Sequence, residues 1–391
     1  MKHNHKLAAL LLCGAMSLSL LAGCAGKQPA AAPTQTQTSA QEESAAAVQP
    51  EETAPEETTQ ENSTVLSIAE QGVFSAGGIT VTSDGTFDPE NQWEETGAGQ
   101  TAHVDHANVL YQIPAEETGL PMVFLHGYGQ SRMGWMTTPD GREGWATYFL
   151  RNGHSAYLVD QPGRGEAGAQ ASMSTDGFLD VWSEDSKEYK PGDQAWYTHF
   201  RIGRVAPKRY EGSQFPEGDE AQNQFFRQMT PNTGNFDQAK AAAALGEVMA
   251  QVKKRTGNKS ISVTHSQGGA VGWDVPVENI AAIVAIEPGG TPQVGSEQYN
   301  RLLEAKIPIA IYFGDYIDNG PEDIASTGFW KQVRDGALDF AEHYNADGGD
   351  CTVVDLPKIG ITGNSHFMFQ EMNSDEIAAN IESWLGEHGL N

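Results

Sequence analysis

A serine stands at the boundary between a predicted strand and a predicted helix. The stretch KSISVTHSQGGAVGW, residues 259–273, has the pattern of a strand that turns sharply around Ser266 and continues as a small-residue helix. A serine on such a turn is exposed for attack on a carbonyl carbon, and small neighbours such as Gly268 and Gly269 let the backbone fold back. The usual pattern is G-x-S-x-G, and Thr264 replaces its first glycine. We predict that Ser266 is a nucleophile, and the alternative is an ordinary turn residue.

A serine hydroxyl becomes a good nucleophile only when a base takes its proton, and a histidine oriented by a carboxylate is the usual partner. His366 is the predicted base, because it lies in the loop GITGNSHFMFQ directly after the last predicted strand. His126 precedes the serine in the chain, which is the wrong order for this arrangement. His103 and His106 are three residues apart on a predicted strand and point to opposite faces, so we predict no metal pair there.

Two positions could supply the carboxylate. Glu287 closes the apolar strand IAAIVAIE, and a buried charge at the end of such a strand is costly unless it has a role. Asp315 and Asp318 follow the next strand, in the polar loop FGDYIDNG, where the same argument has less force. We prefer Glu287 and keep Asp318 and Asp315 as alternative acids. Together with Asp323 these aspartates could bind calcium, but we interpret them as a solvated loop and predict no metal and no organic cofactor.

An oxyanion hole needs two backbone N–H groups directed at the charge that develops on the attacked carbonyl oxygen. The glycine-containing stretch FLHGYGQS, residues 124–131, follows an early buried strand and allows a close approach to the serine. We assign one donor to the N–H of Tyr128. The second is the N–H of Gln267, the residue after the nucleophile.

These residues lie at the ends of predicted strands, so a sheet must position them. Short apolar runs alternate with helical patterns, which is typical of an α/β domain with a largely parallel sheet. We expect the first two strands to form an antiparallel hairpin or meander. The predicted strands are 77–87, 102–115, 121–127, 155–163, 260–266, 280–290, 307–315 and 351–357. The predicted helices are 143–152, 236–255, 328–344 and 374–388.

A polar, turn-rich insertion interrupts this alternation from Glu166 to about Gly234. Such a segment rarely forms a core of its own and often folds over a site as a cap, with its aromatic side chains lining a pocket. The alternative is a surface excursion that the aromatic residues merely attach to the domain. Its aromatic residues include Trp182, Trp196, Tyr197, Phe200, Phe225 and Phe226.

The N-terminus has the pattern of an export signal. A basic start, Met1–Lys6, is followed by an apolar stretch, Leu7–Leu21, that is shorter than a membrane span and leads into LAGC. That ending resembles the lipobox of bacterial lipoproteins, which implies that residues 1–24 are the signal segment and that Cys24 is lipidated. Residues 25–64 contain almost no large apolar side chain, so we expect a disordered tether before the domain at 65–391.

The net charge and the cysteines exclude several classes of protein. A formal charge of −28 argues against a protein that follows nucleic-acid phosphates, because that task needs clustered Lys and Arg. Of the three cysteines, Cys351 alone stays unmodified in the predicted domain, so no intrachain disulfide is expected. A domain of this length can bury enough apolar surface to fold without one. The sequence makes no prediction of oligomeric state.

These motifs together resemble the α/β-hydrolase superfamily, and within it a group of exported bacterial esterases. The similarity extends over most of residues 121–385 and includes THSQGG, AIVAIEPGG, IYFGD and GNSHFMFQEMN. The resemblance implies an α/β-hydrolase fold: a mostly parallel eight-stranded sheet with helices on both faces, here with a cap-like insertion. In that group the acid is a glutamate after the strand that follows the nucleophile, which implies the triad Ser266, Glu287 and His366.

We therefore expect a membrane-tethered, extracytoplasmic serine hydrolase, a carboxylesterase that acts on a small-molecule ester through an acyl-enzyme. Its location would be the outer side of the bacterial cytoplasmic membrane or the periplasm. One alternative is the same triad acting on a lactone, an amide or a thioester. Another is a solute-binding lipoprotein without catalysis, and a third is a hydrolase fold that only binds its ligand.

Overall fold

The computed structural model describes residues 65–391 except 92–97, 169–186, 189–191, 231 and 234. All described residues belong to one unit, Ser63–Asn391. The predicted signal segment 1–24 with Cys24, the predicted tether 25–64 and Trp182 of the insertion lie outside the described residues. No helix in the described part of the chain is long and apolar enough to cross a membrane.

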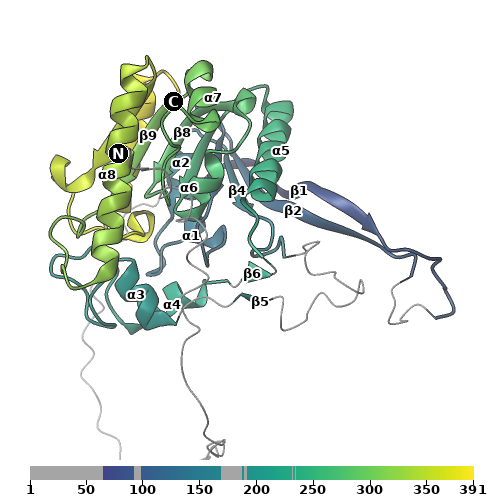
Figure 1. The fold of residues 1–391 in the computed structure, drawn as a ribbon, viewed down its shortest axis with the longest axis horizontal. Helices are drawn as coiled ribbons and strands as arrows, with labels where there is room; N and C mark the ends of the chain where they lie inside the picture. The colour runs from purple at the N-terminus through teal and green to yellow at the C-terminus, as the bar shows by residue number, and fades with distance from the viewer. Residues whose placement is uncertain (1–64, 92–97, 169–186, 189–191, 231, 234) are drawn as a thin grey trace, which may run out of the picture. The chain divides into compact units, whose positions relative to one another are not determined.

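An eight-stranded sheet forms the centre of the fold, with the strand order β1-β2-β4-β3-β7-β8-β9-β10 (Figure 1). Strand β2 runs antiparallel to its neighbours β1 and β4, and every other neighbouring pair is parallel. The predicted eight-stranded, mostly parallel sheet and its antiparallel start are confirmed. The strands are β1 (Ile68–Thr82), β2 (Thr101–Pro114), β3 (Met122–Leu125), β4 (Ala156–Asp160), β7 (Ser260–His265), β8 (Ile280–Ile286), β9 (Pro308–Phe313) and β10 (Asp350–Asp355).

Burial along the strands follows their place in the sheet. Every residue of the central strands β3, β4 and β7 is buried, as expected for parallel strands with both faces covered. Strand β1 lies at the edge and is largely exposed, and Val73 and Ile79 point into solvent. It begins at Ile68 rather than at the predicted Gly77, because an exposed edge strand tolerates the polar residues that conceal its apolar alternation.

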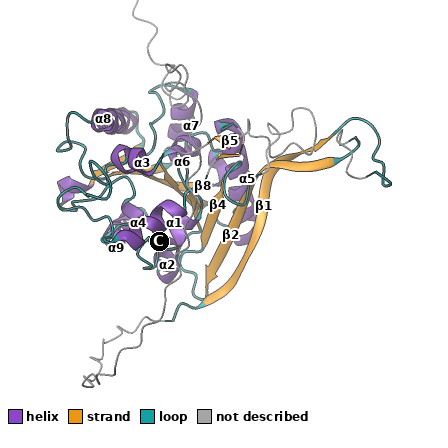
Figure 2. Cartoon of the chain, turned by 90° about the horizontal axis from the view of Figure 1, so that it is seen from below, coloured by secondary structure: helices purple, strands orange, loops and turns teal. Residues whose placement is uncertain are grey.

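Helices cover both faces of the sheet (Figure 2). Helices α2 and α9 pack together on one face, and α5, α7 and α8 lie on the other. The predicted helices correspond to α2, α5, α8 and α9, whereas α1, α3, α4 and α7 are short and were not predicted. The helices are α1 (Met133–Met136), α2 (Trp145–Arg151), α3 (Asp193–His199), α4 (Asp219–Arg227), α5 (Gln238–Thr256), α6 (Gln267–Gly272), α7 (Glu297–Ala305), α8 (Ala325–Ala346) and α9 (Ser374–Glu387).

An aromatic cluster packs the predicted histidine loop against helices α1 and α2. The rings of Trp135 in α1 and Phe369 stack with centroids 4.2 Å apart, and Trp145 in α2 donates from Nε1 to the carbonyl of Ser374 at 3.0 Å. Phe369 belongs to a 3₁₀ turn, Met368–Gln370, that begins two residues after His366. Large rings that are completely buried have few alternative positions, so the cluster fixes the path of the chain on the C-terminal side of His366.

The described part of the insertion attaches to the main domain by hydrogen bonds as well as by apolar contacts. The N–H of Gln214 donates to the carbonyl of Gly363 at 2.7 Å, and that of Met372 donates back to the carbonyl of Gln214 at 2.8 Å. Trp330 in α8 donates from Nε1 to the carbonyl of His199 at 2.9 Å. A two-stranded sheet pairs β5 (Lys187–Glu188), inside the insertion, with β6 (Asn232–Thr233) at its C-terminal end.

Candidate active site

Ser266 occupies a sharp turn between β7 and α6, with φ 55° and ψ −119°. This conformation is costly for a residue with a side chain, so the surrounding structure must impose it. A Cβ atom on Gly268 would lie 2.5 Å from the carbonyl oxygen of His126, and one on Gly127 would lie 2.8 Å from Cβ of Ser266. The loop after β3 and the serine turn therefore touch through their glycines.

His366 lies next to this turn and is almost completely buried. Its Nδ1 donates to Oε2 of Glu287 at 2.6 Å, and its ring stacks on Phe200 with centroids 4.7 Å apart. Its Nε2 has no hydrogen-bond partner among the described residues, so the hydroxyl of Ser266 is not bonded to it in this structure. Such contacts are often long in ligand-free sites and tighten when substrate binds.

His265 connects the serine turn to the histidine loop. Its Nε2 donates to the backbone carbonyl of His366 at 3.0 Å, and its Nδ1 lies 2.9 Å from Oε1 of the Gln130 side-chain amide. Burial lowers the pKa of His265 well below its ordinary value, with a further lowering from the adjacent His366. A neutral imidazole with its proton on Nε2 donates to the carbonyl of His366, and its Nδ1 accepts from Gln130 when the side-chain amide is turned so that its NH₂ group faces the ring. His265 then links three loops without carrying a charge.

Glu287 follows β8 with φ 41° and is completely buried. Its Oε1 accepts a hydrogen bond from the N–H of Gly314 at 2.8 Å and forms an ion pair with Nη2 of Arg201, while Oε2 faces His366. Both carboxylate oxygens are thus paired. The hydrogen bonds and the opposite charge of Arg201 offset the loss of solvent around this buried carboxylate.

The two alternative acids point to other partners. Asp315 accepts hydrogen bonds from the N–H groups of Tyr316 at 2.7 Å and Gly363 at 2.8 Å, and it shapes the loop rather than contacting His366. Asp318 has a side chain that is 55% exposed and pairs with Arg334 at 2.6 Å. Hydrogen bonds from Arg334 lower the pKa of Asp318. Of the three candidates, Glu287 is the one that the structure brings to His366.

The electrostatic setting of His366 favours its neutral form. Burial lowers the pKa of His366 well below its ordinary value, and the cation of Arg201 lowers it further. Because Nδ1 donates to Glu287, the neutral ring carries its lone pair on Nε2. That nitrogen is then available to accept a proton near neutral pH, which is the state required of a general base.

The two predicted oxyanion donors lie beside the serine turn. Gln267 is the first residue of α6, where backbone N–H groups have no partner within the helix. Tyr128 directly follows Gly127, and its ring stacks on Trp196 with centroids 5.7 Å apart. Arg164 bridges the two positions, because Nη2 donates to Oε1 of Gln267 at 3.1 Å while the guanidinium lies 5.3 Å from the Tyr128 ring centroid.

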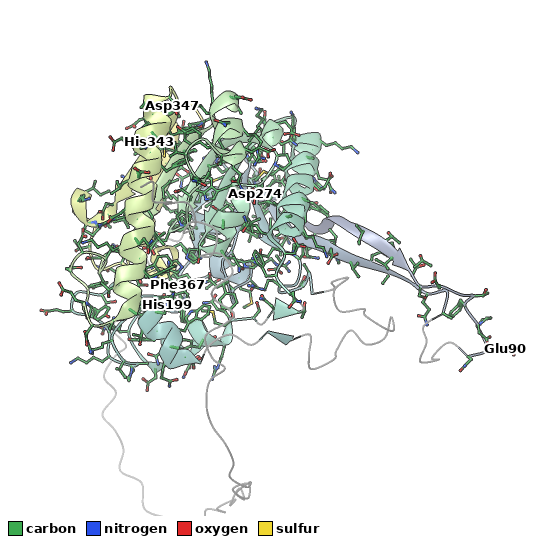
Figure 3. All side chains as sticks on the ribbon, viewed as in Figure 1. Glu90, His199, Asp274, His343, Asp347 and Phe367 are labelled. Carbon is green, nitrogen blue, oxygen red and sulfur yellow. The ribbon has the colours of Figure 1, made fainter. Side chains whose placement is uncertain are left out.

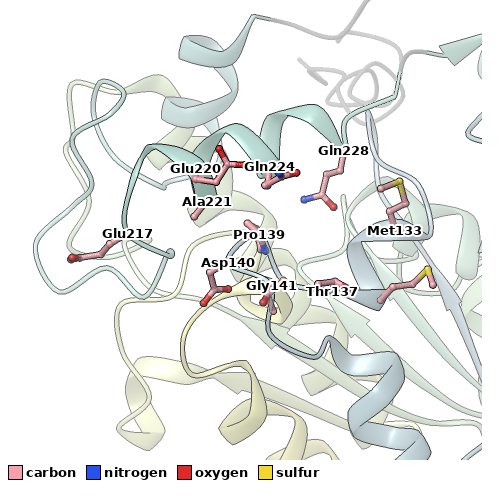
Figure 4. Close-up of a pocket in the computed structure, with 12 residues that line it drawn as sticks. Met133, Thr137, Pro139, Asp140, Gly141, Glu217, Glu220, Ala221, Gln224 and Gln228 are labelled. Carbon is pink, nitrogen blue, oxygen red and sulfur yellow. Dashed lines mark hydrogen bonds between the residues drawn. The ribbon is translucent and has the colours of Figure 1, made fainter. Parts of the chain in front are cut away.

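A cavity of about 710 Å³ lies between the insertion and the segment after α1. Figure 4 shows Glu220 and Gln224 of α4, and Gln228 directly after it, across from the turn that contains Pro139 and Asp140. None of the three predicted triad residues lines this cavity. No group of three or more His, Cys, Asp or Glu side chains is placed to hold a metal ion in the described part of the chain.

Sequence reasoning missed Arg201 and Glu371 at the site, and it named Phe200 only as one of the aromatic residues of the insertion. Arg201 and Phe200 come from the insertion and contact Glu287 and His366, respectively. Glu371 is completely buried and accepts hydrogen bonds from the N–H of Ser365 at 3.0 Å and from Nδ2 of Asn364 at 2.9 Å. Figure 3 labels His199 and Phe367 at the end of α8 near α3, where the insertion meets the histidine loop.

The chain belongs to the α/β-hydrolase superfamily. A solved structure of a novel bacterial esterase is similar to it with a TM-score of 0.70 and 32% sequence identity, covering 83% of this chain and 97% of the esterase. A fungal protein named "Probable secreted lipase phiG" is 25% identical over 324 residues, which are 68% of this chain and 81% of the lipase. No family model matches the chain. The chain is thus similar to an esterase and a lipase.

Proposed function

We propose that this protein is a serine carboxylesterase that hydrolyses a small-molecule ester through an acyl-enzyme. The observation that carries the proposal is the constellation of Ser266 on its strained turn and the His366–Glu287 pair beside it. The names of the two relatives support ester hydrolysis rather than solute binding. No observation favours a lactone, amide or thioester over a simple ester.

The proposed mechanism assigns one task to each residue. Oγ of Ser266 attacks the ester carbonyl carbon while Nε2 of His366 takes its proton, and Glu287 stabilises the resulting imidazolium. The N–H groups of Tyr128 and Gln267 stabilise the oxyanion. The alcohol leaves with the proton from His366, and water, activated by the same histidine, then attacks the acyl-enzyme and releases the acid.

The insertion is the proposed cap of this site. Phe200 packs on the His366 ring, and Trp196 packs on Tyr128, so aromatic side chains of the insertion cover both the predicted base and the predicted oxyanion loop. An apolar cover excludes water and favours an apolar acyl or aryl group next to the serine. The cavity under α4 offers space for a further part of the substrate.

The proposed location is the outer side of the bacterial cytoplasmic membrane or the periplasm, with a lipid anchor at Cys24 and a tether over residues 25–64. The N-terminal pattern and the LAGC ending support export and lipidation. The secreted relative also supports export.

A fluorophosphonate probe tests the triad directly, because it reacts with an activated serine. We expect the purified protein to be labelled, Ser266→Ala to be inert, and His366→Ala to lose about 10³–10⁴-fold in rate. Glu287→Gln should be slower by at least about tenfold, while Asp318→Asn, whose side chain pairs with Arg334, should match the wild type. Normal labelling of Glu287→Gln together with failure of Asp315→Asn or Asp318→Asn would show that the acid is misassigned. An unlabelled wild-type protein would refute the serine hydrolase proposal.

A further inference from the structure

The insertion places a buried cation against the predicted catalytic acid, and the inference drawn from this contact rests on the proposed function. We propose that Arg201 is a positioning residue for Glu287, which it holds ionised and oriented toward His366. The insertion then completes the catalytic centre in addition to covering it.

Arg201 is held from several directions. Its side chain is 2% exposed, Nη2 donates to Oε1 of Glu287, and Nε donates to the backbone carbonyl of Asp315 at 3.0 Å. The guanidinium carbon lies 5.1 Å from the ring centroid of Trp330. A planar group that makes hydrogen bonds in two directions and packs on an aromatic face cannot be replaced by an ammonium group without loss of one of these contacts.

The two oxygens of Glu287 have separate roles. Oε2 accepts the hydrogen bond from His366 at 2.6 Å, and Oε1 receives Arg201 together with the N–H of Gly314 at 2.8 Å. A completely buried carboxylate without a counter-charge tends to take up a proton. A protonated Glu287 could not stabilise the imidazolium that forms at His366, so the cation at Oε1 preserves the function of Oε2.

The backbone around Arg201 also contacts the site. Arg201 has φ 63°, a left-handed conformation that is uncommon for a residue with a side chain and persists only where the surroundings impose it. The preceding carbonyl, that of Phe200, accepts the backbone N–H of His366 at 3.2 Å. Two consecutive residues of the insertion therefore contact both the predicted base and the predicted acid.

The experiment compares the pH dependence of kcat/KM for p-nitrophenyl esters in Arg201→Met and the wild type. Without the cation, the pKa of His366 rises or Glu287 takes up a proton, and both changes remove activity at low pH and restore it at high pH. We expect Arg201→Met to lose up to about tenfold in kcat/KM near pH 6, with the acid limb displaced upward by about one pH unit and the rate recovering toward pH 9. Arg201→Lys keeps the charge, so its kcat/KM near pH 6 should lie between those of the wild type and Arg201→Met.

Arg204→Met is the matched control, because Arg204 lies three residues further on and forms an exposed ion pair with Asp323. Exposed pairs contribute little, so its pH profile should match that of the wild type. An active Arg201→Met variant with an unchanged profile would overturn the positioning role and leave the proposed function intact. A wild-type protein without esterase activity would refute both.

If Arg201→Met folds poorly, a second comparison tests the same proposal. Removal of both partners avoids an unpaired buried charge, so Glu287→Gln is compared with the double variant Arg201→Met/Glu287→Gln. If Arg201 positions Glu287, the two should have the same residual kcat within about threefold at a pH where His366 is neutral in both. A further loss of about tenfold or more in the double variant would overturn the proposal, because it would show a role of Arg201 that does not depend on the carboxylate.

Discussion

Two buried carboxylates near His366 differ in how their charge is compensated. Glu287 pairs with the cation of Arg201, whereas Glu371 receives hydrogen bonds only from neutral donors, the N–H of Ser365 and the amide of Asn364. Burial raises the pKa of Glu371 from 4.5 to about 7. The protonated form of Glu371 is therefore present in the folded protein at mildly acidic pH, directly beside the loop that carries the predicted base.

This difference predicts a pH-dependent stability. A carboxyl group whose pKa is raised on folding contributes stability below its unfolded pKa and loses that contribution as pH rises through the folded pKa. We expect the stability of Glu371→Gln relative to the wild type to increase by up to about 3 kcal/mol between pH 4.5 and 7.5. Urea unfolding of both proteins at several pH values measures this difference in the free energy of unfolding. Glu376→Gln, which changes an exposed carboxylate in α9, should stay within about 0.5 kcal/mol at each pH.

At the residue scale, local sequence indicated the serine and the histidine but not all their partners. Ser266 and His366 stand in turns with recognisable neighbours, and Glu287 ends an apolar strand where a charge is conspicuous. Arg201 had no comparable signal, because it is one charged residue in a polar insertion and its partner Glu287 lies 86 residues away in the chain. A pairing between segments so far apart is decided by the fold rather than by local composition.

At the scale of elements, the close contact between the turn after β3 and the turn before α6 makes a sharp prediction. Gly268→Ala places a methyl group against the carbonyl of His126, and overpacking of this kind costs about 1–3 kcal/mol. We expect lower stability and at least about tenfold slower fluorophosphonate labelling, because a shift of this contact also moves the oxyanion donors.

A glycine in open surroundings is the control for this substitution. Gly336 lies inside α8 and no atom would meet an added Cβ within 4 Å, so Gly336→Ala should stabilise the protein by about 0.5–1 kcal/mol and leave labelling unchanged. Thermal melts measure the stability of both variants, and fluorophosphonate labelling measures the reactivity of their serine. Equal behaviour of the two variants would contradict the steric interpretation of the turn.

The sequence predicted the helices and strands best where an element is buried along its whole length. Strands β3 and β8 are continuous apolar runs, and the α5 pattern ends at Gly257, whose φ of 79° terminates the helix. The short helices α3 and α4 were missed because they lie in the polar insertion and depend on contacts with the main domain. The contact of Trp330 with the carbonyl of His199, at the end of α3, is one example.

At the scale of the whole molecule, all the described site residues lie in the unit Ser63–Asn391. We expect a protein that begins at residue 65 to have the same kcat/KM as the full chain, within about twofold, because the site contacts described above are made among residues 65–391. Cys24→Ser in the full chain should move the protein from the membrane fraction to the soluble fraction if Cys24 carries the lipid. An unchanged distribution would contradict lipidation, and a large loss of activity on truncation would contradict the independence of the unit.

The position of Arg201 has a consequence for engineering by recombination. Enzymes of related fold are often given new specificity by exchange of the segment that covers the site, on the assumption that this segment is separable from the chemistry. Here the exchanged segment, 166–234, would carry away the partner of Glu287 and the carbonyl that holds His366. A transplanted segment must therefore reproduce the pair Phe200–Arg201 before its own specificity can be expressed.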